Sequence, residues 1–148
     1  MSDKVTGAVQ THRNTGFNCA QSVLSQFAPE LGMDTDIAVK VACGLGSGMG
    51  RSGNMCGAVT GGILILGLKY GMTDPEAGED KEKTYEKVRK LLYMIQENFG
   101  SVNCKDLLGV DVGTAEGRQE LKEKNLSDKV CSKVVGEVVR SVEILFDQ

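Results

Sequence analysis

The sequence predicts an all-α fold: one compact single-domain bundle, residues 1–148, of five to seven helices with a glycine-rich loop. Three observations predict it. Apolar residues recur at spacings of three and four along almost the whole chain, which is the period of an amphipathic helix. Apolar residues make up 41% and charged residues 25%, as is ordinary for a globular protein. With only two prolines, the chain has no proline-rich linker that would divide it.

Two helical segments are expected in the N-terminal part of the chain. The first is a weakly apolar stretch over about residues 3–13. Asn18 then stands where an N-cap is needed for a helix over 19–28, because its side chain can accept a hydrogen bond from a free backbone N–H. Pro29 follows the end of that helix. Its predicted apolar face consists of Val23, Leu24 and Phe27.

Two further helices are expected on either side of the glycine-rich loop. Asp34 or Thr35 can cap a helix over about 36–45. Its predicted apolar face, at spacings of four, consists of Ile37, Val41 and Leu45. After the loop, a helix over about 55–70 ends at Gly71. Its apolar residues would suit a strand, but the apolar run continues for about sixteen residues, which is long for a strand.

A long helix is predicted to begin at Thr73 and to run to about Asn98, with Gly100 as its stop. The start combines a cap, a proline in the first turn and acids near the positive end of the helix dipole. Its charged residues predict a solvated outer face. The predicted buried stripe consists of Tyr85, Val88, Leu92, Ile95 and Phe99.

The C-terminal part predicts two short helices and one long one. The short ones are "NCKDLLG" and the polar segment "TAEGRQELKEKN". Ser127 is the predicted cap of the last helix, over about 128–146. Its inward face is predicted to consist of Val130, Val134, Val138, Val142 and Leu145.

The loop itself raises a choice between a phosphate site and a thiol site. Residues 44–62 hold eight glycines together with Cys56, and residues 48–53 fit the G-x-G-x-x-G pattern. A dinucleotide site needs a strand before that pattern and an acidic residue after a second strand. Here a helix precedes it, no βαβ pattern follows, and no G-K-[ST] is present. The context therefore argues against nucleotide binding.

Several classes of function are disfavoured by composition. The net charge is −3, and the lysines are scattered among acids, so there is no basic footprint for nucleic acid. The most apolar run, residues 58–68, is about half as long as a membrane span requires. The N-terminus lacks the apolar core of a signal peptide. We therefore expect no nucleic-acid partner, no membrane insertion and a cytoplasmic location, where thiols stay reduced.

The five cysteines carry the chemical signal. Four of them stand at predicted helix starts: Cys19, Cys56, Cys104 and Cys131. Free N–H groups and the helix dipole favour thiolate over thiol there, and the thiolate is both the nucleophile and the metal ligand. Cys56 has the best-marked helix start and is the predicted attacking thiolate. Cys43 lies among apolar neighbours and is expected to be structural. The only histidine, His12, has no evident partner and is expected at the surface.

Four blocks of the chain together resemble a known family. The blocks are "GFNCAQSVL", "GSGMGRSGNMCGAVTGGILILGLKYG", "NCKDLLG" and "VCSKVVGEVV". They resemble the redox-active proteins named for their C–GCAxxG–C–C cysteine pattern, from about Phe17 to Leu145. The central motif stands here in the order C-G-A-x-x-G. The resemblance implies a small helical redox protein whose four characteristic cysteines are Cys19, Cys56, Cys104 and Cys131, and a related domain is associated with an iron–sulfur cluster.

Two classes of function stay open at this stage. In the first, the four cysteines are redox-active thiols, either as ligands of an iron–sulfur cluster or as a thiol/disulfide centre. The protein would then be an electron carrier or an oxidoreductase with a redox protein partner. In the second, they hold a structural zinc ion in a module that docks to a partner. The pairs Gly57/Gly61 and Ala58/Gly62 allow close helix packing, either inside the monomer or at the seam of a homodimer.

Overall fold

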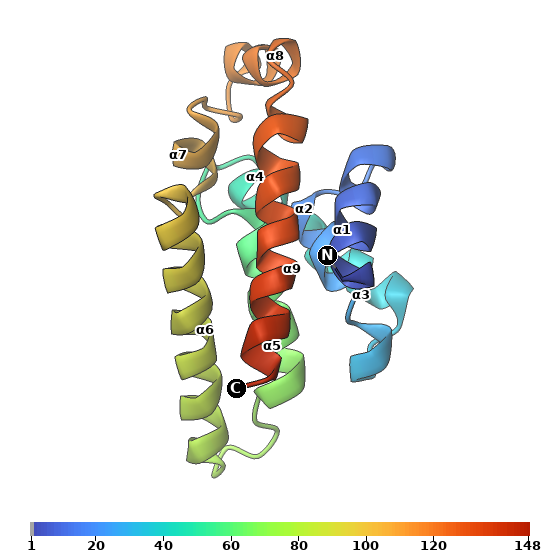
Figure 1. Cartoon of the computed structure of the whole chain (residues 1–148), viewed down its shortest axis with the longest axis vertical. Coiled ribbons are helices and arrows are strands. Elements are labelled where there is room, and N and C mark those ends of the chain that lie inside the picture. The colour runs from blue at the N-terminus through green and yellow to red at the C-terminus, as the bar shows by residue number, and fades with distance from the viewer. Residues whose placement is uncertain (1) are drawn as a thin grey trace.

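The computed structural model describes residues 2–148 and confirms the all-α prediction (Figure 1). The described residues contain nine α-helical segments: α1 (Asp3–Asn14), α2 (Cys19–Leu24), α3 (Thr35–Ala42), α4 (Gly46–Met49), α5 (Gly57–Tyr70), α6 (Gly78–Phe99), α7 (Cys104–Leu108), α8 (Ala115–Glu123) and α9 (Ser132–Phe146). Short 3₁₀ turns lie at Pro29–Leu31 and Cys43–Leu45, and a π-helical turn lies at Ser127–Cys131. Among residues 2–148, no helix is long and apolar enough to cross a membrane.

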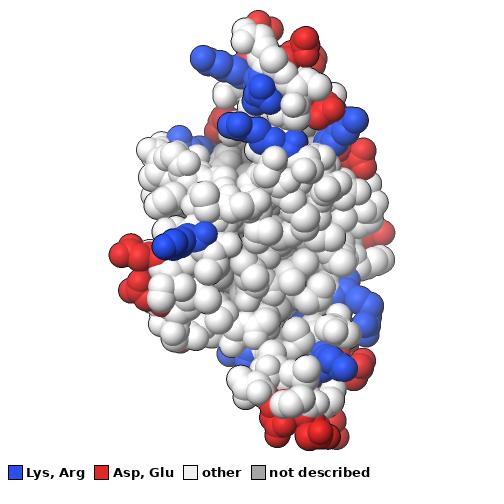
Figure 2. Space-filling model, turned by 180° about the vertical axis from the view of Figure 1, so that it is seen from behind, with Lys and Arg blue, Asp and Glu red and all other residues white. Residues whose placement is uncertain are grey.

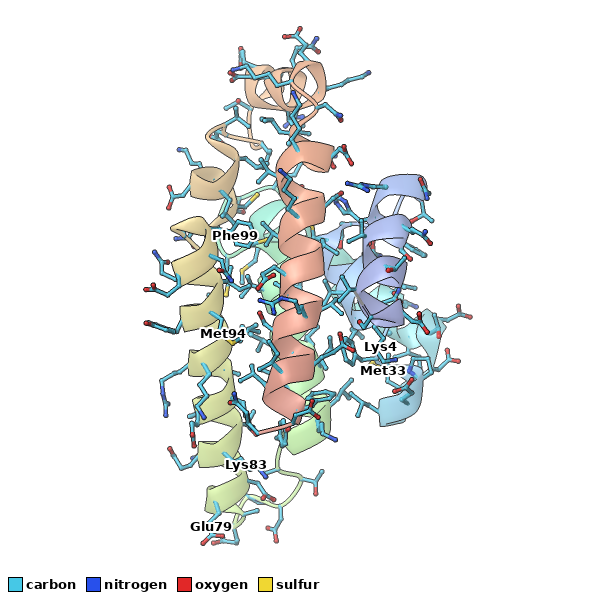
Figure 3. All side chains as sticks on the ribbon, in the orientation of Figure 1. Lys4, Met33, Glu79, Lys83, Met94 and Phe99 are labelled. Carbon is cyan, nitrogen blue, oxygen red and sulfur yellow. The ribbon has the colours of Figure 1, made fainter. Side chains whose placement is uncertain are left out.

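Helix α5 is the centre of the core. It is apolar on nearly all sides, which is the pattern of a helix surrounded by protein. It packs against α2, α6 and α9, while α1 packs against α9 (Figure 1). Side chains fill the spaces between these helices, and Met94 and Phe99 of α6 pack against the core (Figure 3). Helices α7 and α8 lie at one end of the bundle, beside the start of α9.

The glycines of α5 allow close packing within the monomer. A Cβ at Gly61 would lie 3.0 Å from the backbone oxygen of Ala20, so α2 approaches the α5 backbone directly. On another side, a Cβ at Gly62 would lie 2.8 Å from Cγ1 of Val138 and 2.9 Å from Cδ2 of Leu91. The small-residue seam therefore joins α5 to its own neighbours.

Two of the predicted caps and much of the predicted core are confirmed. Asn18 and Gln21 form a capping box at the start of α2, and Asp34 accepts backbone hydrogen bonds at the start of α3. The following predicted core residues are buried: Val23, Leu24, Phe27, Ile95, Val134, Val138, Val142 and Leu145. These positions lie on helices with strong apolar periodicity, where burial is easiest to predict.

One helix end and one helix face near the N-terminus differ from the prediction. Helix α2 ends at Leu24 and not at 28, because the chain turns before Pro29. On α3, Ile37 and Val41 are each 53% exposed, while Ala38 and Ala42 are buried. Helix α3 packs against α2, and its buried face carries these two alanines and not the larger apolar residues.

The start of α6 also lies later than predicted. The Asp74 side chain accepts a hydrogen bond from the N–H of Glu76, which makes a local turn, and the helix begins at Gly78. Tyr85, predicted to be buried, is 52% exposed, and Leu91 is fully buried. Lys87 is also buried: its ammonium donates to the backbone oxygens of Leu145 and Gln148 and so ties α6 to the end of α9.

Candidate functional site

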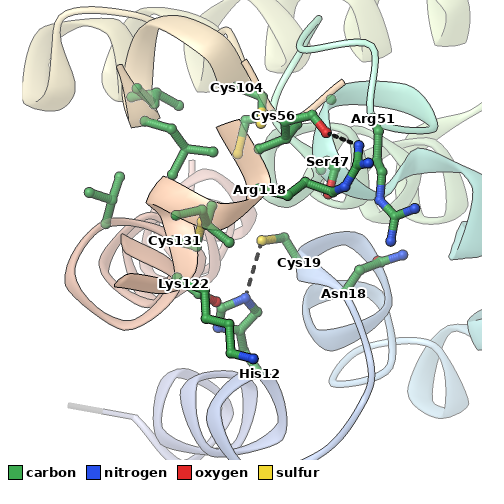
Figure 4. A pocket seen from close by; sticks show the side chains of 18 of the residues that line it. His12, Asn18, Cys19, Ser47, Arg51, Cys56, Cys104, Arg118, Lys122 and Cys131 are labelled. Atoms are coloured by element: carbon green, nitrogen blue, oxygen red, sulfur yellow. Dashed lines mark hydrogen bonds between the residues drawn. The ribbon is translucent and has the colours of Figure 1, made fainter. Parts of the chain in front are cut away.

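All four cysteines predicted to be functional line one cavity of about 570 Å³ (Figure 4). They come from four separate segments of the chain: Cys19 from α2, Cys56 from the start of α5, Cys104 from α7 and Cys131 from the π-helical turn. All are free thiols. Cys43 does not line the cavity; it is exposed at the end of α3 and not packed among apolar neighbours inside the helix, as the structural role predicted for it would require.

A left-handed turn in the glycine-rich loop forms one wall. Residues 47–51 all have φ between +55° and +70°. Such a turn costs a residue with a Cβ about 1–2 kcal/mol, and Ser47, Met49 and Arg51 adopt this conformation without being glycine. Gly48 and Gly50 avoid that cost. The G-x-G-x-x-G residues therefore form a tight turn beside the thiols, with no strand leading into it.

A short antiparallel bridge holds Cys56 and Cys104 in register. Met55 pairs with Asn103, the N–H of Cys56 donates to Val102 at 2.8 Å, and the N–H of Cys104 donates to Asn54 at 2.7 Å. Side chains alternate between the two faces of such a pair, so Cys56 and Cys104 lie on the same face. The bridge explains how two cysteines 48 residues apart in the chain reach one cavity.

Cys19 is paired with the histidine. It is the first residue of α2, and its Sγ lies 3.4 Å from Nε2 of His12. Nδ1 of His12 lies 2.9 Å from Oγ of Ser132. Burial and the charge of Arg13 lower the pKa of His12, which favours the neutral imidazole. The prediction that His12 is an unpartnered surface residue is therefore wrong. Its partners lie 7 and 120 residues away, so no local pattern could reveal both.

Cys131 lies in a different setting from the predicted one. The π-helical turn Ser127–Cys131 continues directly into α9, and Ser127 makes no side-chain cap. Cys131 is thus not at a free helix start. The thiol of Cys19 is the main cause that lowers the pKa of Cys131, and the same interaction, with burial, raises the pKa of Cys19 well above its usual range. The first proton leaves this pair more easily than an isolated thiol and the second less easily.

Cys56 and Cys104 have raised pKa values, as Cys19 does. Each is only 7% exposed. Burial raises the pKa of Cys56 to about 11, although the N–H groups of Ala58 and Val59 act in the opposite direction. Burial, and then the neighbouring thiols, raise the pKa of Cys104 to about 12. At a helix start the free N–H groups favour the thiolate, but here desolvation outweighs them. In this structure Cys131, and not Cys56, is the thiol closest to the thiolate form.

Comparison with known proteins identifies the family of the chain. The family described as "Putative redox-active protein (C_GCAxxG_C_C)" matches residues 17–145, nearly the whole chain. The chain belongs to this family. Neither a curated protein nor a solved structure matches it. The family description names a redox role and four cysteine positions, and in this member these cysteines meet at one cavity.

A zinc ion and an iron–sulfur cluster place different demands on the four thiols. A mononuclear zinc site needs three or four ligands about 2.0–2.3 Å from one point. Among residues 2–148, no three Cys, His, Asp or Glu side chains are arranged to hold a single metal ion. An iron–sulfur cluster is a different case because its thiolates bind separate irons. The four thiols around one cavity are donors of the kind that a cluster uses, but among residues 2–148 the side chains form no group that could hold a metal ion.

Three cations also line the cavity. They are Arg51 in the left-handed turn and Arg118 and Lys122 on α8 (Figure 4). No aspartate or glutamate is among the described residues that line it. In Figure 2, Lys, Arg, Asp and Glu side chains are mixed at the end of the molecule where α8 lies, above a broad uncharged middle. The rim of the thiol cavity itself carries three cations and, among its lining residues, no carboxylate.

Proposed function

We propose that the protein is a thiol–disulfide redox protein in which Cys19 and Cys131 form the reactive pair. The observation that carries this proposal is geometric: Cys19 and Cys131 line one cavity, and Sγ of Cys19 lies 3.4 Å from Nε2 of His12. The pKa of Cys131 is lowered and that of Cys19 is raised, which supports the assignment. A dithiol centre needs such an asymmetry: one thiolate to attack and one protonated thiol that reacts second. Cys56 and Cys104 are more buried and stay protonated at neutral pH.

The reaction follows from these positions. The Cys131 thiolate attacks one sulfur of a substrate disulfide, and the substrate S–S bond breaks to give a mixed disulfide and one free thiolate. Cys19 then loses its proton to Nε2 of His12 and attacks Sγ of Cys131. The mixed disulfide breaks, the second substrate thiolate leaves, and a Cys19–Cys131 disulfide forms. Two electrons pass to the substrate, and each released thiolate takes up a proton.

His12 is placed to accept that proton. Its ring is 3.4 Å from the Cys19 sulfur, and Ser132 holds the other ring nitrogen. If Nδ1–H donates to Oγ of Ser132, Nε2 is the free acceptor facing Cys19. The lowered pKa keeps the ring neutral and able to accept. A protein electron donor would then reduce the disulfide again.

Trapping of the mixed disulfide tests this order of events. In Cys19→Ser, the second attack is abolished, so 2-hydroxyethyl disulfide should leave a stable adduct on Cys131 that peptide mass mapping identifies. In Cys131→Ser the adduct on the remaining cavity cysteines should be at least tenfold slower to form. Cys43→Ser is the matched control, because Cys43 lies outside the cavity. An adduct that forms first on Cys56 or Cys104 would refute the assignment.

An iron–sulfur cluster is the second candidate, and the meeting of four thiols at one cavity supports it. Cys19, Cys56, Cys104 and Cys131 would be the ligands, and a bound cluster would supply one-electron transfer. Anaerobic reconstitution with iron and sulfide should then give visible absorbance and stoichiometric iron in the wild type. The absorbance should be lost in Cys56→Ser and kept in Cys43→Ser. A colourless, iron-free wild type under these conditions would eliminate this candidate.

A further inference from the structure

The cations at the cavity rim have no acidic partners. None of Arg51, Arg118 and Lys122 takes part in an ion pair within residues 2–148. Lys124, at the end of the same helix, differs because it is paired with Glu120. Arg118 donates one hydrogen bond, to the backbone oxygen of Val112 at 3.0 Å, which fixes the side chain across the wall of the cavity.

The charge of these residues is not used to activate the thiols. The pKa shifts of the four cavity cysteines come from burial, from backbone N–H groups and from the other thiols. No arginine or lysine is among the causes of these shifts. A positive rim without carboxylates raises the local concentration of anions and repels cations.

We propose that the substrate of this cavity is a negatively charged disulfide, bound through its carboxylate or other anionic groups by Arg51, Arg118 and Lys122. Arginine suits this task because its guanidinium can hold a carboxylate through two parallel hydrogen bonds. Arg118 and Lys122 are four residues apart on α8 and so lie on one face of that helix. Figure 4 shows Arg51 and Arg118 on the same side of the cavity. This inference rests on the thiol–disulfide function for the reaction, but the anion preference is a property of the rim alone.

Two alkylating reagents of similar size test the anion preference without any disulfide chemistry. Iodoacetate is an anion and iodoacetamide is neutral, and each forms a bond between the thiolate sulfur and its CH₂ carbon as iodide leaves. The ratio of their rates is measured by mass spectrometry at Cys131 and, in the same sample, at the exposed Cys43. One cation near the reacting anion raises its reaction rate about fivefold where water screens the charges. The iodoacetate-to-iodoacetamide rate ratio should therefore be about fivefold higher at Cys131 than at Cys43. Equal ratios at the two cysteines would overturn the inference.

Three disulfides with one skeleton test the substrate class: 3,3′-dithiodipropionate is an anion, 2-hydroxyethyl disulfide is neutral and cystamine is a cation. The reduced protein should react fastest with the anion and slowest with the cation. Arg118→Gln combined with Lys122→Gln should lower the anionic-to-neutral rate ratio at least fivefold, and Lys124→Gln should leave it within twofold.

The two hypotheses fail differently. If all three disulfides oxidise the protein at equal rates, the thiol–disulfide function stands and the anionic substrate is refuted. If the alkylation preference is present but no disulfide reacts, the rim binds anions and the thiol–disulfide function is refuted.

Discussion

Replacing Gly48 by alanine tests whether the left-handed turn holds the thiols in place. Gly48 has φ +67° and is buried, and a Cβ there would lie 2.6 Å from N of Asn54 and 2.7 Å from Cβ of Cys104. Asn54 and Cys104 are joined by a backbone hydrogen bond beside the antiparallel bridge, so neither residue can move without disturbing it. Gly50 is the matched control: its φ is +61°, and a Cβ there would meet nothing within 4 Å.

The expected magnitudes follow from these contacts. Both alanines adopt a left-handed conformation at a cost of about 1–2 kcal/mol. Both also gain about 0.4–1 kcal/mol from the restricted unfolded chain. These contributions cancel in the comparison. What remains at Gly48 is the insertion of a methyl group into a packed site, which costs about 1–3 kcal/mol.

Urea unfolding of the two variants measures this difference. With an m-value of about 2 kcal/mol/M, the midpoint of Gly48→Ala should lie about 0.5–1.5 M below that of Gly50→Ala. Alkylation of Cys104, which is 7% exposed in the native protein, should also be faster in Gly48→Ala. Equal midpoints would refute the claim that this turn packs directly on Cys104.

Three further predictions concern a buried ammonium, a helix cap and a thiolate. Lys87→Met should lower the free energy of unfolding by about 1–3 kcal/mol, because two backbone oxygens lose a charged donor. Lys90→Met, which removes only an exposed ion pair, should cost about 0–1 kcal/mol, and equal urea midpoints for the two variants would contradict this. Asn18→Ala should cost about 1–2 kcal/mol in the same assay, since the capping box is lost; no change would show that the cap is dispensable. The rate of Cys131 alkylation by iodoacetamide should rise with pH through a midpoint below that of an ordinary cysteine thiol, because the neighbouring Cys19 thiol lowers the pKa of Cys131. The midpoint should move upward in Cys19→Ala, which removes the main cause, and an unchanged midpoint in that variant would contradict the assignment.

The sequence predicts those features that depend on local pattern. Asn18 and Asp34 cap their helices as expected, because capping needs only residues within one turn. The valines at four-residue spacing on α9 are buried because the stripe on one helix decides which face points inward. The choice of four cysteines, leaving out Cys43, also agrees with the residues that line the cavity.

Other features depend on contacts that the sequence does not display. The left-handed conformation of Ser47 and Arg51 is imposed by hydrogen bonds across the loop, against the preference of residues with a Cβ. The acidity of Cys131 depends on Cys19, which lies 112 residues earlier in the chain. At Cys56, the helix-start effect was the local signal, but burial by distant segments outweighs it. The ranking of the thiols therefore needed the fold.

The most direct test of the account is the identity of the first disulfide formed by the wild-type protein. The fully reduced chain is treated with one equivalent of 2-hydroxyethyl disulfide, the remaining thiols are alkylated at low pH, and the linked peptides are identified by mass spectrometry. The account predicts a Cys19–Cys131 disulfide, with Cys56 and Cys104 recovered as alkylated thiols. A first disulfide between Cys56 and Cys104, or four alkylated thiols with no disulfide, would contradict it.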